Sequence, residues 1–213
     1  MIYVVKHKED EKKYPPGYKE LKVGKISDHL LEDNIEHLNP FINELTGLYY
    51  IWKNTKDDIV GLCHYRRVFV EDGKPLSWEM VVEKANSCDI VVSRSTTFQK
   101  PIRENLRDHF CVTKDVFDKY YNIITSREPG LREFWETDVF HPNNIFIARR
   151  EIADGYCKWL FPLIVPIAEQ FSWENNNGDA VHTRMVGYMS ERLLSYYILK
   201  NGLYYEGCEV GQW

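Results

Sequence analysis

The sequence predicts an α/β fold in which a mostly parallel central sheet is flanked by helices. Short continuous apolar runs at residues 59–63, 88–93 and 144–148 are typical of buried strands. Stretches with apolar residues at helical spacing alternate with these runs, which favours a parallel sheet covered on both faces. The length of 213 residues is compatible with one large α/β domain or two small ones, and we predict a single domain spanning residues 1–213.

The first part of the chain contains two predicted strands and a helix before the run at 59–63. Residues 2–6 (IYVVK) are predicted to form a buried strand, and residues 18–25 (YKELKVGK) a second one. Asn39 and Pro40 are typical of a helix start, with Asn as the N-cap and Pro at the first helical position. The predicted apolar face has the spacing i, i+3, i+4, i+7 and consists of Leu45, Leu48, Tyr49 and Trp52.

Helices also follow the later strands. Thr113 is predicted to cap a helix whose apolar face consists of Val116, Phe117, Tyr120, Tyr121 and Ile124. Residues 154–161 (DGYCKWLF) form an aromatic helix, and residues 180–200 an amphipathic one that stops at Asn201 and Gly202. In sheets of this kind ligands bind beyond the carboxyl ends of the strands, so polar residues there are the first functional candidates.

Composition excludes several classes of protein. The 27 basic and 32 acidic residues give a net charge of −5, which argues against a nucleic-acid partner held by bulk charge. Five scattered cysteines without a CxxC pair indicate a reducing compartment and no zinc ribbon. The longest apolar run, residues 159–168, contains two prolines and falls short of the roughly 18 residues that span a bilayer. We predict a cytoplasmic protein, with peripheral association at the inner face of the membrane as the only membrane role.

The 6 Trp, 14 Tyr and 10 Phe residues are the unusual part of the composition. Such residues either fill a core or stack flat ligands such as bases and sugars, and composition does not choose between these roles. Most of those on predicted helices lie at core spacings, namely Tyr49, Trp52, Tyr120, Trp159, Phe161 and Tyr196.

The strongest polar cluster is His64-Tyr65-Arg66-Arg67, directly after the predicted strand at 59–63. Guanidinium groups bind phosphate oxygens in a bidentate manner, so two arginines at a strand end suit a diphosphate. The alternative is an edge strand whose arginines pair with surface carboxylates.

Four further clusters are open to a functional or a purely structural interpretation. Glu44 and Thr46 lie near a helix N-terminus, which attracts anions but also needs ordinary capping. Arg184 and Glu191 are seven residues apart and share a helix face, where a salt-bridge network is the alternative. The others are His141 with Asn143 and Asn144, which also fit a plain turn, and His109 with Arg107 and Asp108.

Several familiar motifs are absent from the sequence. It contains no GxxxxGK[ST], GxGxxG, HExxH or GxSxG pattern. It also has no D-x-D pair, and the related Asp57-Asp58 and Glu136-Thr137-Asp138 do not replace one convincingly. No cofactor is therefore firmly predicted, and binding of a divalent metal, Mn²⁺ or Mg²⁺, stays an open alternative.

The stretch NPFINELTGLYYIWKNTKDDIVGLCHYRRVF at residues 39–69 resembles a bacterial family long catalogued only as a domain of unknown function. The segments CDIVVSRS, IRENLRDHFCVTKDV, NNIFIARREIADGYCKWLF and GYMSERLLSYYILKN match it in the same order, so the resemblance covers nearly the whole chain. Tyr50 and Ile145 replace the family's usual Trp and Met. Members look like glycosyltransferases of the GT-A type that serve capsular polysaccharide, exopolysaccharide or lipopolysaccharide synthesis.

This resemblance implies a single Rossmann-like GT-A domain that transfers a hexose, with galactose as one candidate, from a nucleotide sugar. A UDP-linked donor and a glycan or lipid-linked saccharide acceptor are expected. The HYRR segment stands where D-x-D usually falls. We therefore hypothesise that Arg66 and Arg67 neutralise the leaving diphosphate and so take over part of the metal's role, while His64 donates a hydrogen bond or orients the two arginines.

The remaining roles follow the same resemblance. An inverting transfer needs a carboxylate to deprotonate the acceptor, and Glu191 is the first choice, with Asp89 second. The residues expected to bind the donor are Val5, His7, Asn34, Glu44, Thr46, Tyr49, Tyr65 and Asn144. Those expected near the donor sugar or acceptor are His109, Asn143 and Arg184.

Two other classes of function remain open. A non-catalytic nucleotide-sugar-binding module of a larger synthase would carry the same arginines. A nucleotidyltransferase or phosphotransferase would use them on a pyrophosphate, but such enzymes need a metal held by carboxylates, and the missing D-x-D counts against this class.

Overall fold

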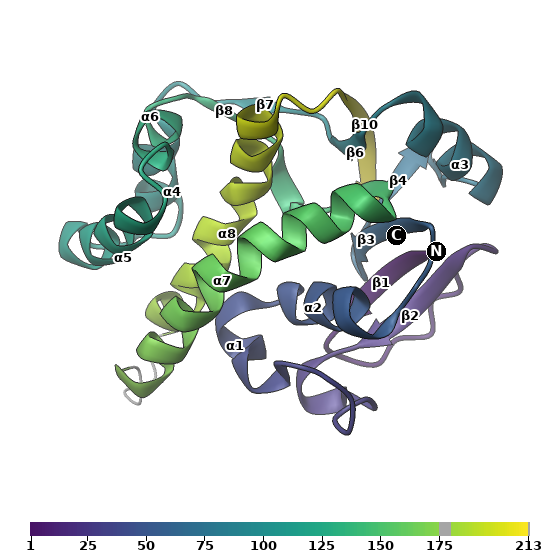
Figure 1. Cartoon of the computed structure of the whole chain (residues 1–213), viewed down its shortest axis with the longest axis horizontal. Helices are drawn as coiled ribbons and strands as arrows, with labels where there is room; N and C mark the ends of the chain where they lie inside the picture. Colours follow the sequence, from purple (N-terminus) through teal and green to yellow (C-terminus); the bar gives the residue numbers. More distant parts are fainter. Residues whose placement is uncertain (175–179, 213) are drawn as a thin grey trace.

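The computed structural model describes residues 1–174 and 180–212 and contains a central sheet with helices around it (Figure 1). The strands are β1 (Ile2–Lys6), β2 (Tyr18–Lys22), β3 (Ile59–His64), β4 (Arg67–Glu71), β5 (Lys74–Pro75), β6 (Ile90–Ser93), β7 (Thr96–Thr97), β8 (Val139–Phe140), β9 (Phe146–Arg149) and β10 (Tyr205–Gln212). The helices are α1 (Asn39–Ile42), α2 (Leu45–Asn54), α3 (Trp78–Ser87), α4 (Ile102–His109), α5 (Lys114–Arg127), α6 (Leu131–Trp135), α7 (Arg150–Glu174) and α8 (Ala180–Asn201), with 3₁₀ turns η1 (Gly24–Ile26), η2 (Glu36–Leu38) and η3 (Pro142–Asn144).

The sheet is mixed, which corrects the expectation of a mostly parallel one. Within the described residues its order is β2-β1-β3-β9-β6-β10-β4-β5, with a further pairing of β3 and β4. Strands β1, β2 and β3 are parallel, as are β6 and β10, but β9 runs antiparallel to both β3 and β6. The direction of β9 follows from the segment 94–141, which leaves the sheet at the carboxyl end of β6 and returns to that same end. The next strand, β9, must then run back across the sheet.

Alternate residues of the central strands face two different hydrophobic clusters. In β1, Tyr3 and Val5 belong to the cluster that includes α2, α7 and α8, whereas Ile2 and Val4 belong to the one that includes α3. In β9, Phe146 packs on the first side and Ile147 on the second. Helices therefore cover both faces, as the apolar strand runs predict, and the α/β class is confirmed.

The predicted helix start at Asn39 is the start of α1, a helix of only one turn. Asn39 is the first residue of α1, after Leu38 as N-cap, and α1 ends at Ile42, because the next residue, Asn43, has φ 52°. The long helix α2 starts afterwards and has Glu44 as its N-cap residue. Asn39 instead holds the junction together, since its Nδ2 donates to the backbone oxygen of Asn43 and to Thr46 Oγ1.

Helix α7 extends from Arg150 to Glu174 and so is much longer than the predicted 154–161. It continues through Pro162 and Pro166, which sequence reasoning would place at a helix end. Helix α8 ends where predicted, and Gly202 follows it with a φ of 58°. No helix in the described ranges combines the length and apolar character that a membrane crossing requires.

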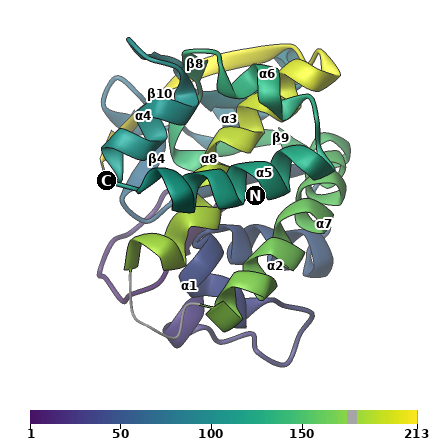
Figure 2. The ribbon, with the colours of Figure 1, turned by 90° about the vertical axis from the view of Figure 1, so that its left-hand side faces the viewer.

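The segment 94–141 contains β7, α4, α5, α6 and β8, and its three helices gather beside α8 (Figures 1 and 2). Glu128, at the end of α5, anchors this lobe. Its carboxylate accepts hydrogen bonds from Trp159 Nε1 at 3.0 Å, from the Tyr196 hydroxyl at 2.9 Å and from Lys200 Nζ at 2.6 Å. The lobe is thereby tied to both long helices.

Candidate functional site

Two adjoining cavities open at the carboxyl ends of β1 and β3. The larger has a volume of about 460 Å³ and the smaller about 240 Å³. We call them the large chamber and the small chamber. Five residues line both: Asn43, Glu44, His64, Arg66 and Arg184. The small chamber adds Val5, His7, Val23, Asn39 and Pro40.

The HYRR segment lies at the junction of the chambers because β3 turns there into β4. His64 ends β3, and its backbone pairs with Arg67, the first residue of β4, and with Val5 of β1. The tight turn pushes the Arg66 and Arg67 side chains into solvent, and both line the large chamber. Tyr65 is buried instead, with its ring 5.1 Å from that of His7 and 4.6 Å from that of His64.

His64 is a neutral imidazole in this setting. Burial lowers its pKa to about 3, and the positive charges of Arg66 and Arg67 act in the same direction. The pKa of His7 is lowered as well, first by burial and then by Arg66. Neutral rings donate and accept hydrogen bonds without adding charge, so the arginines supply the positive charge of the junction.

Three arginines face the cavities without a carboxylate partner among the described residues. Arg66 and Arg67 form no ion pair there, and Arg184 Nε donates to the amide oxygen of Asn43 at 3.2 Å. All three side chains are exposed. In a protein of net charge −5, this is a local concentration of positive charge that suits a polyanion.

Glu44 faces this junction as a carboxyl whose pKa is shifted close to neutral pH. Burial raises its pKa to about 7, against the hydrogen bond that Asn144 Nδ2 donates to Glu44 Oε1 at 3.1 Å. The negative charge of Glu191 acts in the same direction as burial. Below this raised pKa the protonated carboxyl can donate a hydrogen bond to an anion rather than repel it.

Helix α8 supplies the opposite wall, because Arg184, Tyr188, Glu191 and Arg192 repeat at helical spacing. Glu191 Oε1 accepts from the backbone NH of Asn143 at 2.7 Å, and Glu191 Oε2 accepts from Arg192 Nη1 at 2.5 Å. The helix passes close to α1 at Gly187, where an added Cβ would lie 2.9 Å from the backbone oxygen of Phe41.

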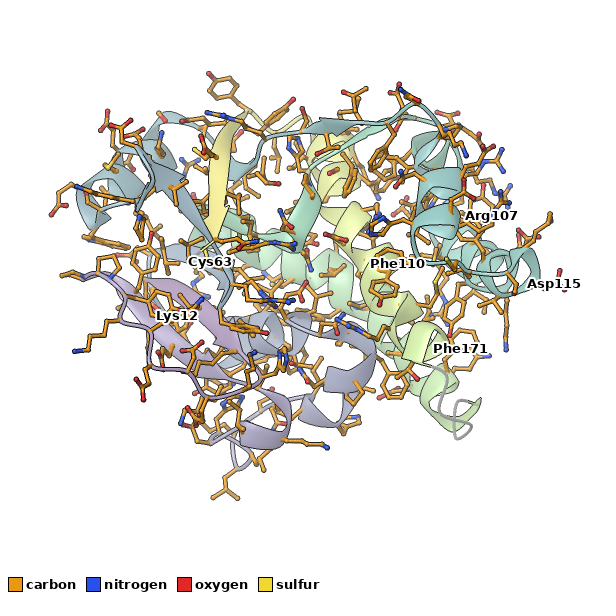
Figure 3. All side chains as sticks on the ribbon, turned by 180° about the vertical axis from the view of Figure 1, so that it is seen from behind. Lys12, Cys63, Arg107, Phe110, Asp115 and Phe171 are labelled. Carbon is orange, nitrogen blue, oxygen red and sulfur yellow. The ribbon has the colours of Figure 1, made fainter. Side chains whose placement is uncertain are left out.

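The lobe at 94–141 closes the large chamber on its remaining side. Its contribution consists of Thr96, Phe98, Asn105, His109, Phe110 and Phe140. The Phe110 ring stacks on that of Tyr188, with centroids 3.7 Å apart and planes 8° from parallel. Figure 3 shows Phe110 lying against α8.

The structure brings ten of the predicted site residues to the chambers and leaves the others outside. Those that line a chamber are Val5, His7, Glu44, His64, Arg66, Arg67, His109, Asn143, Arg184 and Glu191. Asn144, another predicted donor residue, reaches the site through its hydrogen bond to Glu44. Asn144 is fully buried behind Glu44, and Tyr65 lies beneath the histidines.

Three predicted donor residues lie away from the chambers for physical reasons. Asn34 folds back on its own loop, where its Nδ2 donates to the backbone oxygens of Leu30 and Glu32. Thr46 is buried and hydrogen-bonded to Asn43 and Asn39. Tyr49 points from α2 to Phe161, with ring centroids 5.1 Å apart.

The other predicted carboxylate and turn residues have structural partners. Asp89 lies at the start of β6, opposite the chambers, and pairs with Arg149 at 3.2 Å. His141 is buried, and its Nδ1 lies 2.7 Å from the backbone oxygen of Ser93. Among the described residues, no three His, Cys, Asp or Glu side chains converge in a way that would hold a metal ion.

Sequence reasoning missed the aromatic side of the large chamber. Phe98, Phe110, Phe140 and Tyr188 come from distant parts of the chain. Phe110 and Tyr188 lie in segments 102–116 and 187–201, which match the family, but nothing in those segments marks these rings as site residues. The available signal was positional, since Phe110 follows His109 and Tyr188 stands one helical turn after Arg184.

The comparisons with known proteins agree with this architecture. A solved structure, the apo form of the bifunctional glycosyltransferase WbbM, is similar with a TM-score of 0.83 and 23% sequence identity. The similarity covers 99% of this chain and 45% of that one, so this chain spans less than half of WbbM. It shows a shared fold. No curated protein matches the chain.

The resemblance inferred from the ELT and HYRR motifs is confirmed by a family match. Residues 1–202 fit the family described as "Domain of unknown function (DUF4422)", which leaves only the last residues of the 213 outside. The chain therefore belongs to the DUF4422 family.

Proposed function

We propose that this chain is a glycosyltransferase that moves a hexose from a nucleotide sugar, UDP-linked, to a glycan or lipid-linked saccharide. The observation that carries the proposal is a set of three arginines without carboxylate partners in the described structure. Arg66 and Arg184 line both chambers, and Arg67 lines the large one beside them. The fold shared with WbbM, a bifunctional glycosyltransferase, and the family membership support it.

The chambers divide the substrates between them. The diphosphate binds at the junction, where the guanidinium groups and neutral His64 donate hydrogen bonds to its oxygens. The nucleoside enters the small chamber, whose walls include Val5, Val23 and Pro40. The hexose and the acceptor then occupy the large chamber, on the side of Glu191.

The transfer follows from this placement. In an inverting reaction, Glu191 takes the proton of the acceptor hydroxyl, whose oxygen bonds to the anomeric carbon. The bond from that carbon to the phosphate oxygen breaks, and its electron pair leaves with UDP. Arg66 and Arg67 stabilise the negative charge that develops on the leaving diphosphate, in part of the role that a divalent metal plays elsewhere.

The experiment measures UDP binding by isothermal titration calorimetry for wild type and for Arg66→Ala, Arg67→Ala and Arg184→Ala. Each change removes a charge-assisted contact, so we expect the affinity to fall about 10- to 100-fold. Arg94→Ala is the matched control, because Arg94 is exposed but lines neither chamber and pairs with Glu209 at 3.4 Å. Unchanged UDP affinity in all three variants would contradict the proposal.

A second measurement separates the enzyme from a non-catalytic binding module. With a radiolabelled UDP-hexose, wild type should release UDP and form a labelled saccharide, and Glu191→Gln should bind UDP but not transfer. A wild-type protein that binds UDP-hexose and never cleaves it, with or without saccharide acceptors, would favour the binding module.

A further inference from the structure

We infer that the Phe110–Tyr188 stack is an acceptor subsite, on which one pyranose ring of the acceptor lies with its apolar C–H face. This inference rests on the proposed function and deepens it, because it assigns the lobe at 94–141 the choice of acceptor. The first observation is that the two chambers are lined by different parts of the chain. Within the described chain, residues of the lobe line the large chamber, and none of them lines the small one.

The second observation is the chemistry of the large chamber. Four aromatic rings lie there beside hydrogen-bonding side chains such as Asn105 and His109. A pyranose presents hydroxyl groups at its rim and polarised C–H groups on its face, and the face of an aromatic ring carries partial negative charge. A wall that combines aromatic faces with polar groups therefore matches a sugar better than a phosphate.

The third observation is how firmly the stack is held. Arg192 is buried, with its guanidinium 4.7 Å from the Phe140 ring centre and 5.8 Å from that of Phe110. Its Nη1 donates to the Tyr188 backbone oxygen at 2.8 Å and to Glu191. One side chain thus joins the aromatic stack to the candidate base. A sugar seated on the stack is held at a set position relative to Glu191.

A nucleobase is the competing occupant, since aromatic rings stack bases as well. Two features place the base elsewhere. The arginines without carboxylate partners stand at the junction, so a base in the small chamber leaves the diphosphate among them. Glu191, which faces the large chamber, would repel a diphosphate drawn further in.

The test uses saturation-transfer difference NMR with the methyl α- and β-pyranosides of galactose, glucose and mannose as probes, recorded with and without UDP. Phe110→Leu removes the ring at nearly constant volume, and Phe110→Tyr keeps it. Tyr204→Leu is the control, because Tyr204 is 70% exposed and lines neither chamber. We expect wild type to saturate the protons on one face of at least one glycoside, and Phe110→Leu to weaken that binding about 3- to 10-fold.

Calorimetry with UDP on the same variants separates the possible failures. The inference requires UDP affinity in Phe110→Leu to stay within about twofold of wild type. Loss of UDP binding in that variant, with an unchanged melting temperature, would place the base on the stack and overturn the inference. Equal glycoside signals in wild type and Phe110→Leu, or no signal from any glycoside in wild type, would also overturn it. Failure of wild type to bind UDP would instead overturn the proposed function.

Discussion

Glu44→Gln is the substitution whose effect the structure defines most closely. Glu44 lies at the junction of the two chambers, and its Oε1 accepts a hydrogen bond from Asn144 Nδ2 at 3.1 Å. Glutamine keeps the shape of the side chain and an oxygen that can accept this bond. The substitution therefore removes the titrating proton and little else.

The magnitude follows from the pKa of Glu44, which burial raises to about 7 from an ordinary value of 4.5. The native state thus keeps the proton to higher pH than the unfolded state. The stability linked to this proton is fully present below pH 4.5 and is lost as the pH rises through 7. A tenfold change in proton affinity corresponds to about 1.4 kcal/mol, so the total loss is about 3 kcal/mol.

The assay is urea denaturation, followed by tryptophan fluorescence, at several values from pH 4.5 to pH 8. The unfolding free energy of wild type minus that of Glu44→Gln should fall by about 3 kcal/mol over this interval and then level off. Other titrating groups cancel in this difference. Glu83→Gln, which removes an exposed carboxylate of α3 outside both chambers, controls for the change in net charge. A difference that does not vary with pH would refute the argument.

Three further predictions follow from the same site. His64→Gln should raise stability in acid, because burial lowers the pKa of His64 to about 3 from 6.5. The native imidazole then resists a proton that the unfolded chain accepts, which costs about 2–3 kcal/mol at pH 4.5, and an unchanged acid-unfolding midpoint would contradict this. Gly187→Ala should lower the unfolding free energy by about 1–3 kcal/mol and weaken UDP binding, because the new Cβ would lie 2.9 Å from the Phe41 backbone oxygen and closer still to Asn43 Nδ2. An unchanged melting temperature in that variant would contradict this prediction, because it would mean that α1 and α8 can move apart to accept the new Cβ without cost. Transfer activity should persist in EDTA, since the arginines stabilise the leaving group, and strict dependence on Mn²⁺ would exclude this role but not the transfer itself.

Much of the architecture was predictable because burial leaves a local record. The run IVGLC predicts β3 almost to its last residue, and CDIVVS predicts β6, since strands covered on both faces must be apolar throughout. The ends of the helices were less predictable than the strands. Asn39 and Pro40 carry the signals of a helix start, but the chain breaks at Asn43, where φ is 52°. Pro162 and Pro166 lie inside α7, where packing between the sheet and α8 overrides local propensity.

In the candidate site, too, some residues could be predicted from the local sequence and others could not. His64, Arg66 and Arg67 could be selected from sequence, because four polar residues directly follow a buried strand and such strand ends meet at one edge of the sheet. The family resemblance places Asn34 and Tyr49 among the donor residues, yet their side chains turn to a loop and to Phe161. Sequence spacing locates a residue on an element, but it does not say which neighbour that side of the element meets.

The sequence by itself determined the α/β class, the family and the positively charged strand end, since each rests on residues adjacent in the chain or repeating at a fixed period. Only the tertiary structure decided the antiparallel direction of β9, the raised pKa of Glu44 and the stack of Phe110 on Tyr188. These features depend on which distant segments pack together. The rings of Phe110 and Tyr188 meet only because the lobe at 94–141 folds back against α8. Burial likewise changes the pKa of Glu44 only once α2, η3 and α8 have closed around it.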